Sequence, residues 1–450
     1  MEKCDVLLTY EIKNREIENL CLVKRELERR GYTVKLRMQY ETFFLTQPPL
    51  QARLVVVPAY YRPRHQFYTA SHTVKTEKIL NMMWEQVLEA ASEQDNHLHD
   101  IKPWGRKASH IIWGDEMYEK LINRFSVPED HVFKTGHIAL DFLREPVVRY
   151  FEDRDSVFSA FSIPKDKRVH LFISSLAIGD MDMRVMKQAS SDDPMGIKYQ
   201  QFGKICRETR EILVSWFRKI LEENENNIII YRPHPEESGC DSLMKLAEEQ
   251  KRFFVIGERS VKQWILTSDK IYSWMSTSIE EVYAAGKECE ILRPVDVPKD
   301  LDIKAYSNAQ YITSFDEFRD VFISDKDRIT LPKEELSKHY YIPQEKMSYE
   351  LVCDAIEQIL REDKYCIDPP MYNSLSGSWN VERFKNWLKC KIAQSQFFEK
   401  VHESEKCKYG YIRELIDDIF YMKQKLEKNY VPDDEIERII TRLDNAIQGD

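Results

Sequence analysis

The first third of the chain alternates short apolar runs with amphipathic stretches. Residues 5–12 (DVLLTYEI) predict a buried strand, residues 14–31 repeat apolar positions at helical spacing and end at Gly31, and residues 32–39 (YTVKLRMQ) predict the next strand. The same alternation continues through 52–61, 78–87, 109–125 and 131–143. Strands separated by helices favour a parallel, doubly wound sheet, so we expect an α/β fold.

A charged, helix-prone stretch at 144–168 interrupts this alternation and is a candidate linker. A second series of strands and helices follows it, with apolar runs such as HLFIS, NIIIY, FFVIG and KIYSWM. We therefore expect one Rossmann-like domain over 1–150, a second over 165–345, and a helical C-terminal region over 346–450. Two such series in one chain predict a cleft between the domains, where ligands usually bind. The C-terminal helices either pack across the two domains or serve a partner or membrane interface.

Length, charge and cysteine usage narrow the class of protein. At 450 residues the chain exceeds what one hydrophobic core usually serves, which also favours two domains. Its net charge of -10 argues against a nucleic-acid partner. The nine cysteines form no CxxC pair, so we expect reduced thiols and neither a disulfide framework nor a zinc site. Without a signal peptide or a long apolar run, we expect a cytoplasmic protein, with peripheral association at the inner face of a membrane left open.

Polar residues that directly follow apolar strands are the candidates for chemistry. The carboxyl ends of the strands of an open α/β sheet face the ligand crevice, so a side chain placed there can reach a bound molecule. Four such ends stand out: Glu85 and Gln86 after ILNMMW, Asp180 and Asp182 after LFISSLAIG, Arg232 to Glu237 after NIIIY, and Ser276 to Glu280 after KIYSWM.

The segment STSIEE, which begins at Ser276, has the pattern of a helix start. Thr277 and Glu280 fit a T-x-x-E capping box, and the first amides of such a helix can hold a phosphate. Glu280 could alternatively accept hydrogen bonds from a ribose diol. Taken alone, the box is more often a purely structural helix cap, because capping boxes are common.

The segment RPHP is built to hold a histidine rigidly. Pro233 and Pro235 restrict the backbone, so His234 projects in a fixed direction. A rigid imidazole near a phosphate can donate a hydrogen bond or offset negative charge. Arg232 is either structural support or a further cation. The two acids that follow, Glu236 and Glu237, are expected to be solvated, because acids favour helix N-termini.

Two segments together resemble a known group of enzymes. YRPHPEES, followed about forty residues later by WMSTSIEEVYAAGKECEIL, resembles the C-terminal half of GT-B glycosyltransferases of bacterial surface-polysaccharide synthesis, including capsule Kdo transferases and bacterial sialyltransferases with a His-Pro motif. The N-terminal half is similar to the same group through ILNMMWEQV, ASHIIWGDEMYEKL and VFKTGHIALDFL. The resemblance covers roughly residues 5–325 and implies two Rossmann-like domains facing a cleft, with a helical C-terminal extension.

The resemblance also implies a nucleotide site in the second domain. In that group the His-Pro histidine and the Ser/Thr residues hold the nucleotide phosphate and ribose. The corresponding positions here are His234, Pro235, Ser276, Thr277 and Ser278.

Two carboxylates complete the implied chemistry. In the retaining Kdo enzymes an aspartate after the first strand of the C-terminal domain resembles a nucleophile, which corresponds to Asp180 or Asp182, and a glutamate of the N-terminal domain resembles the acid/base, which corresponds to Glu85. The loop that begins SSLAIGDMD is longer than in the capsule enzymes, so the choice between the two aspartates stays open. WEQV also lacks the glycine of the group's acidic-acidic-Gly motif.

The implied activity is transfer of a sugar from a nucleotide-activated donor to an oligosaccharide or lipid-linked glycan of the bacterial surface. The first candidate donor is a CMP-ulosonic acid, such as CMP-Kdo or a sialic-acid-like sugar. Alternatives are a CDP-glycerol or UDP-sugar transferase or epimerase, and a catalytically silent binding or scaffold protein. No cofactor is expected. Although Asp180 and Asp182 match a D-x-D spacing, we expect a metal-independent enzyme. Glycosyl transfer needs a base or a carboxylate nucleophile, which these acids supply.

Overall fold

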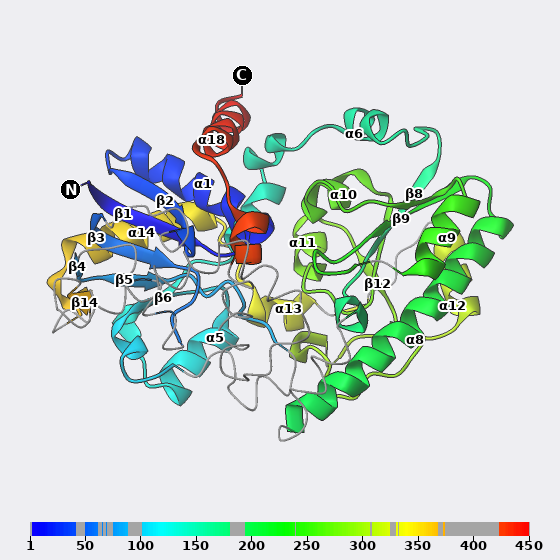
Figure 1. The fold of residues 1–450 in the computed structure, drawn as a ribbon, viewed down its shortest axis with the longest axis horizontal. Coiled ribbons are helices and arrows are strands. Elements are labelled where there is room, and N and C mark those ends of the chain that lie inside the picture. Colours follow the sequence, from blue (N-terminus) through cyan, green and yellow to red (C-terminus); the bar gives the residue numbers. More distant parts are fainter. Residues whose placement is uncertain are drawn as a thin grey trace, which may run out of the picture. The chain divides into compact units, whose positions relative to one another are not determined.

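The structure, a computed structural model, describes residues 2–41, 50–61, 65, 69, 75–88, 101–180, 194–238, 240–306, 308–324, 330–331, 333–367, 372–373 and 423–449. The chain forms two compact units (Figure 1). Unit 1 comprises Met1–Gln86, Leu98–Ile138 and Tyr341–Asp450, and unit 2 comprises Val87–His97 and Ala139–Tyr340. The stretch 144–168 that the sequence marks as a linker candidate therefore belongs to unit 2.

Unit 1 is built on a parallel sheet of six strands within the described residues, in the order β2-β1-β3-β5-β6-β7. The strands are buried apolar runs, and Leu7, Val55 and Ile79 share one core cluster. Their bounds are β1 (Lys3–Tyr10), β2 (Val34–Met38), β3 (Gln51–Val57), β5 (Ile79–Asn81), β6 (Ser109–Ile112) and β7 (Val132–Lys134). The helices are α1 (Lys13–Arg29), α5 (Asp115–Glu119), α14 (Ser348–Arg361) and α18 (Asp433–Gln448), and β4 (Lys75–Thr76) pairs with β14 (Tyr372–Asn373).

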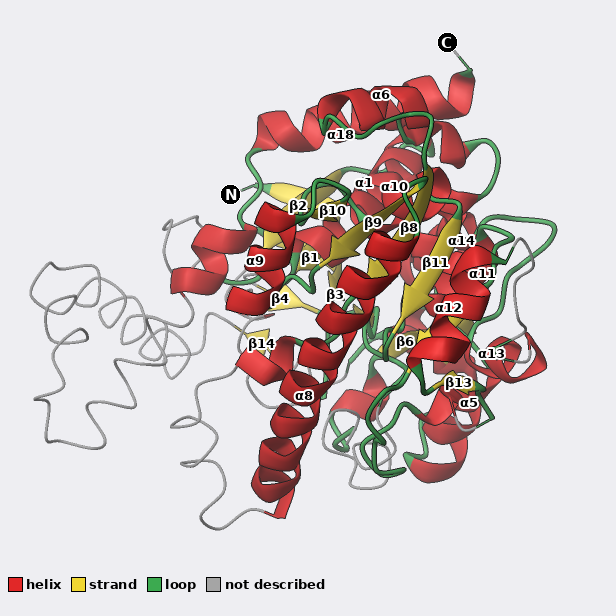
Figure 2. Ribbon diagram, turned by 90° about the vertical axis from the view of Figure 1, so that its right-hand side faces the viewer, coloured by secondary structure: helices red, strands yellow, loops and turns green. Residues whose placement is uncertain are grey.

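Unit 2 repeats the plan with a second parallel sheet, in the order β10-β9-β8-β11-β12-β13. Its strands are β8 (Arg168–Ile173), β9 (Asn227–Arg232), β10 (Phe253–Val255), β11 (Lys270–Ser273), β12 (Cys289–Leu292) and β13 (Tyr311–Ile312). Its helices are α6 (Arg154–Ala160), α8 (Pro194–Glu223), α9 (Asp241–Glu249), α10 (Val261–Thr267), α11 (Ile279–Ala284), α12 (Phe315–Ile323) and α13 (Lys333–His339). Helices α8, α10 and α11 contact β9, β8 and β12, respectively (Figure 2).

Both sheets reverse their strand order beside their first strand. In unit 1 the chain passes from β1 to β2 on one side and then places β3 on the other side of β1. In unit 2 it passes from β8 through β9 to β10 and then places β11 on the other side of β8. Such a switch point opens a crevice at the carboxyl ends of the two strands that flank it. The predicted α/β fold with two Rossmann-like series is confirmed.

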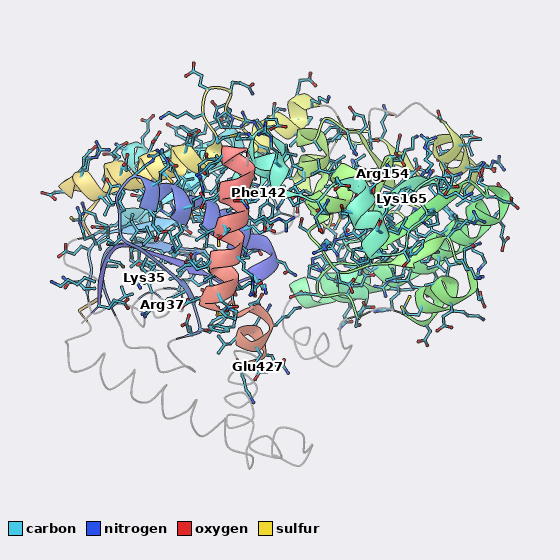
Figure 3. The ribbon with its side chains drawn as sticks, turned by 90° about the horizontal axis from the view of Figure 1, so that it is seen from above. Lys35, Arg37, Phe142, Arg154, Lys165 and Glu427 are labelled. Carbon is cyan, nitrogen blue, oxygen red and sulfur yellow. The ribbon has the colours of Figure 1, made fainter. Side chains whose placement is uncertain are left out.

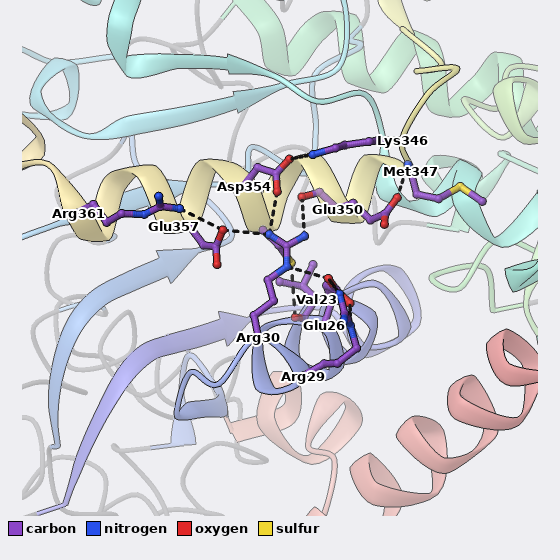
Figure 4. A network of polar contacts seen from close by, with 11 residues as sticks. Val23, Glu26, Arg29, Arg30, Lys346, Met347, Glu350, Asp354, Glu357 and Arg361 are labelled. Atoms are coloured by element: carbon purple, nitrogen blue, oxygen red, sulfur yellow. Dashed lines mark hydrogen bonds and ion pairs between the residues drawn. The ribbon is translucent and has the colours of Figure 1, made fainter.

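The C-terminal region returns to unit 1 and packs on α1. Arg30, at the end of α1, donates hydrogen bonds to Glu26 and, across to α14, to Asp354 at 2.7 Å and Glu357 at 3.3 Å (Figure 4). Helix α18 contacts the same helix (Figure 3). Asp444 of α18 pairs with Arg25 of α1 at 2.6 Å. The described part of the C-terminal region belongs to unit 1 and is mainly helical, apart from the short strand β14. Among the described residues, no helix is both long enough and apolar enough to cross a membrane.

The return of the chain to unit 1 depends on a close backbone approach at Gly136. The Tyr341 amide donates to the Trp113 carbonyl at 2.6 Å, which brings the Tyr341 carbonyl over the loop after β7. Gly136 has a φ of +78°, and a Cβ atom there would lie 2.3 Å from the Tyr341 carbonyl oxygen. Only glycine fits this position without moving the chain.

We expect Gly136→Ala to lower the free energy of unfolding by about 2–4 kcal/mol, because a strained positive φ and a backbone clash both act against it. Urea unfolding of unit 1, followed by circular dichroism, measures the loss. Gly31→Ala is the matched control, since Gly31 has a φ of +93° and nothing within 4 Å of the added atom. The control should lose only about 1 kcal/mol. Equal losses of unfolding free energy in the two variants would show that the Tyr341 carbonyl does not clash with a Cβ atom at position 136.

Candidate functional site

The switch point of unit 2 is lined by serines. Ser174 and Ser175 follow β8, and the Ser175 hydroxyl accepts a hydrogen bond of 3.1 Å from the Met275 amide, which follows β11. The Ser174 hydroxyl also forms a hydrogen bond of 2.8 Å with the Tyr231 hydroxyl of β9. The ends of three neighbouring strands are therefore joined through hydroxyl groups. Ser174 and Ser175 are not among the residues predicted from the sequence. Their position directly after an apolar strand could have identified them.

The segment after β11 places three more hydroxyl-bearing residues at this edge. Ser276 and Ser278 are half-buried and Thr277 is exposed. The Ser276 hydroxyl accepts from the Ser278 amide at 3.2 Å, which closes the turn. Within the described part of the chain, the amide and hydroxyl of Thr277 make no hydrogen bond. Thr277 is thus the residue of this turn that is best able to bind an external acceptor or donor.

The predicted capping box at Thr277 and Glu280 is wrong. Helix α11 begins at Ile279 with Ser278 as its N-cap, and no side chain caps it. The first amides, from Ile279 to Glu281, bond to carbonyls three residues earlier, as in a 3₁₀ turn. Those amides are therefore bonded within the turn and are not the orphan donors that the sequence pattern predicts.

Glu280 instead points into the interior of unit 2. It is 6% exposed, and the Tyr340 hydroxyl is a hydrogen-bond partner of its carboxyl group. Burial raises the pKa of Glu280 well above its usual range, and the charge of Lys262 offsets this only in part. The Glu280 carboxyl group is therefore an internal partner of Tyr340 and is not exposed to a ribose.

The segment after β9 holds His234 in one orientation. The His234 amide donates to Glu237 at 3.0 Å, and the Glu236 amide donates to His234 Nδ1 at 3.2 Å. Since Nδ1 accepts, the neutral ring carries its proton on Nε2. This tautomer makes Nε2 a hydrogen-bond donor of the kind that a phosphate oxygen requires. Pro235, beside it, is exposed.

Arg232 directs its guanidinium group at backbone carbonyls. It donates to Ile256, Gly257 and Arg259, with 2.6 Å to the last, and it is 9% exposed. Burial lowers the pKa of Arg232 to about 10. These contacts hold the loop after β10 against β9, so they support the structural role that the sequence analysis offered as one of two alternatives.

Glu237 is not solvated, contrary to expectation. Its side chain is fully buried, and its carboxylate accepts from the Tyr231 hydroxyl and lies 3.5 Å from Arg210 of α8. The buried guanidinium group of Arg210 supplies the compensating charge. Glu236, next to it, is exposed as expected.

Asp180 shares the same arginine. One of its carboxylate oxygens accepts from Arg210, and the other accepts from the Ser238 amide at 3.0 Å. Arg210 also donates to the Leu176 carbonyl at 2.8 Å. Asp180 therefore ties the loop after β8 to α8 and to the loop after β9. Asp182 lies outside the described residues.

In unit 1, Glu85 and Gln86 follow β5 with different surroundings. Glu85 is exposed and forms an ion pair with Arg15 of α1. Gln86 is buried and bridges two backbone groups, donating to the Ile111 carbonyl at 3.0 Å and accepting from the Trp113 amide at 2.9 Å. Of the two, Glu85 has the exposure that chemistry on a bound molecule requires.

The switch point of unit 1 is occupied by the protein's own groups. The first amide of α1, at Lys13, donates to the Asn429 side chain at 2.9 Å. The Glu11 amide, at the end of β1, donates to the buried Glu16 carboxylate at 2.8 Å. The amides at the end of β1 and the start of α1 are therefore already bonded within the protein, which leaves them unavailable to a phosphate. Among the described residues, no group of three or more His, Cys, Asp or Glu side chains could hold a metal ion in either unit.

Comparison with known proteins identifies no family for the chain. No known protein family matches the sequence, and no curated protein matches it. The chain is similar to the wall teichoic acid polymerase TagF, in a variant soaked with CDPG, at 11% identity over 80% of this chain and 88% of that one, with a TM-score of 0.48. It is similar to a UDP-GlcNAc 2-epimerase from Methanocaldococcus jannaschii at 12% identity, over 79% and 100%, with a TM-score of 0.47. A third similar structure is S. aureus MnaA with UDP, at 12% identity over 87% and 97%, with a TM-score of 0.42.

We expect the stability of the protein to depend on pH through Glu280. The raised pKa means that the fold favours the protonated carboxyl group, so its contribution is complete below the unfolded pKa, near 4.5, and is lost as the pH rises above it. Glu280→Gln mimics the neutral group. Its free energy of unfolding relative to wild type should therefore grow with pH, by at most about 1.4 kcal/mol per pH unit.

Urea unfolding of wild type and Glu280→Gln between about pH 5 and about pH 7 measures this difference, and the comparison cancels the titration of distant groups. A difference that stays constant over this range would mean that Glu280 is ionised in the folded protein.

Proposed function

We propose that this protein is a glycosyltransferase that uses a nucleotide-activated sugar, and that unit 2 holds the nucleotide. The observation that carries this proposal is the switch point between β8 and β11. Its two strand ends present Ser174, Ser175 and the Ser276–Ser278 turn, and His234 follows the neighbouring strand β9. Uncharged donors and one imidazole at a switch point suit a phosphate and the sugar attached to it.

The spacing of the strands fits such a ligand. Neighbouring strands lie about 4.8 Å apart, so the ends of β9 and β11, with β8 between them, are separated by about 10 Å. His234 on one side and the exposed Thr277 on the other can therefore contact different parts of one nucleotide. At the corresponding edge of unit 1 the Glu11 and Lys13 amides already bond to Glu16 and Asn429, which favours unit 2 as the nucleotide site.

The donor and acceptor are proposed at the level of chemical class. The first candidate donor is a CMP-linked ulosonic acid such as Kdo or a sialic-acid-like sugar, and the acceptor is an oligosaccharide or lipid-linked glycan of the bacterial surface. These assignments rest on the resemblance of YRPHPEES and WMSTSIEE to the GT-B enzymes described above. CDP-glycerol and UDP-sugars are the competing donors, and the binding experiment below separates them.

Two carboxylates are proposed for the transfer itself, with two candidates for one of them. Glu85 transfers protons, and Asp180 or Asp182 attacks the anomeric carbon, which displaces the nucleoside phosphate and forms a glycosyl-enzyme that the acceptor hydroxyl then resolves. Asp180 already bonds to Arg210 and to the Ser238 amide, so its attack would require one of these contacts to be released. No metal ion is part of this scheme.

We expect His234→Ala and Ser276→Ala each to weaken nucleotide binding by about 10-fold, because each removes one hydrogen bond to a charged group. A thermal-shift panel of CMP, CDP, UDP and GDP first identifies the nucleotide, and titration calorimetry then gives the affinities. Ser156→Ala is the control, since Ser156 lies on α6 before β8, bonded to Asp153.

Affinities in both variants equal to wild type would refute the proposed nucleotide site. Binding of none of the four nucleotides by wild type would instead favour a catalytically silent scaffold.

We expect Glu85→Gln, incubated with the CMP-sugar, to accumulate a covalent sugar adduct, because the resolving step then lacks its base. Intact-protein mass spectrometry detects the added mass, and peptide mapping distinguishes Asp180 from Asp182. Replacement of the modified aspartate by Asn should abolish the adduct. An inverted product formed without any adduct would establish single displacement, with one carboxylate as general base.

A further inference from the structure

A chain of three charged side chains leads from the interior of unit 1 to its surface. The exposed fractions of the side chains are 0% for Glu16, 27% for Arg15 and 44% for Glu85. Arg15 donates from Nη2 and Nε to one oxygen of Glu16, at 2.6 and 3.0 Å. Its Nη1 donates to Glu85. Arg15 thus holds a buried carboxylate with one edge and an exposed carboxylate with the other.

The buried end of this chain is fixed to the sheet. The second oxygen of Glu16 accepts from the Glu11 amide at 2.8 Å, directly after β1. Glu11 in turn accepts from the Tyr40 hydroxyl at 3.0 Å, after β2. Burial raises the pKa of Glu16 to about 6, against the opposing effect of Arg15. The position of Glu16 is therefore set by backbone, and the position of Arg15 is set by Glu16.

We propose that Glu16 and Arg15 are positioning residues for Glu85, and that they hold its carboxylate in one orientation at the surface of unit 1. This inference rests on the proposed function, in which Glu85 transfers protons. Two bonds from one edge of the planar guanidinium group to Glu16 prevent it from rotating. An exposed ion pair between Arg15 and Glu85 alone would order Glu85 only weakly.

Helix α1 offers a matched control at its other end. Glu26 is also buried, with 3% of its side chain exposed, and it also binds arginines, Arg29 and Arg30, at 2.7 Å (Figure 4). Its network reaches α14 and not Glu85. Glu26→Gln and Glu16→Gln therefore remove the same charge from the same helix, and only the second removes the support of Glu85.

The first experiment measures the orientation of Glu85 without any enzyme activity. The full-length protein is treated with a water-soluble carbodiimide and glycinamide, and peptide mass spectrometry follows the rate at which Glu85 is modified. We expect the rate to rise about fivefold in Glu16→Gln, because Arg15 no longer holds Glu85. Glu26→Gln should match wild type. An unchanged rate in Glu16→Gln overturns the proposal.

The second experiment tests the consequence for transfer. Wild type is assayed for nucleotide release from CMP-Kdo, CMP-sialic acid, CDP-glycerol and UDP-GlcNAc, and the variants are compared on the donor that is used. Glu16→Gln should lower kcat by about tenfold with donor KM within about twofold, because the group transferring the proton is misplaced while donor binding is intact. Glu16→Asp, which keeps the charge, should restore part of kcat, and Glu26→Gln should retain it.

The two experiments separate the possible failures. If wild type uses none of the four donors, the proposed function is overturned, while the modification rates still decide whether Glu16 controls Glu85. If modification accelerates but kcat is unchanged, the positioning of Glu85 has no role in transfer and the proposal is overturned. If Glu16→Gln does not fold, the modification rate of Glu85 and kcat are measured in Arg15→Lys instead, because Arg15 is partly exposed.

Discussion

A buried guanidinium group organises the carboxyl edge of unit 2. Arg210 of α8 has 2% of its side chain exposed, and a charge removed from water must find partners within the protein. Its partners, Asp180, Glu237 and the Leu176 carbonyl, come from the loops after β8 and β9. Both loops are therefore held against α8. The direction in which His234 leaves the sheet depends on this network, because its amide donates to Glu237.

The carboxyl edges of the two sheets differ in the side chains that they present. Both sheets are parallel and reverse their strand order beside their first strand, so each has a switch point where two strand ends diverge. In unit 2 these ends present hydroxyl groups, and the acidic side chains nearby are neutralised by Arg210. In unit 1 the Glu11 and Lys13 amides at the corresponding place bond to Glu16, which Arg15 neutralises, and to Asn429. The two edges therefore differ in whether their polar groups are already bonded within the protein.

Contacts between residues far apart in sequence account for what the pattern analysis could not predict. The acids after His234 were expected in water because acids favour helix starts, yet Glu237 is buried against an arginine of α8 that precedes it in the chain. Glu280 fits a capping box by spacing, yet it faces Tyr340, which arrives from α13. Arg232 is a possible cation for a phosphate by its position in the sequence, yet its guanidinium group donates to three carbonyls of the loop after β10.

The residue pattern is enough to predict the strands and helices, their parallel α/β arrangement and the polar residues that end each strand. Those features follow from neighbouring residues, because the alternation of apolar and polar positions decides which face of each element is buried. Which of the strand-end residues are exposed, and which bind other groups of the protein, follows from the folded arrangement alone. Folding also joined α14 and α18 to α1, through pairs such as Arg30 with Asp354, 324 residues apart. Burial and ion pairing depend on elements brought together by folding, and their partners leave no local pattern in the chain.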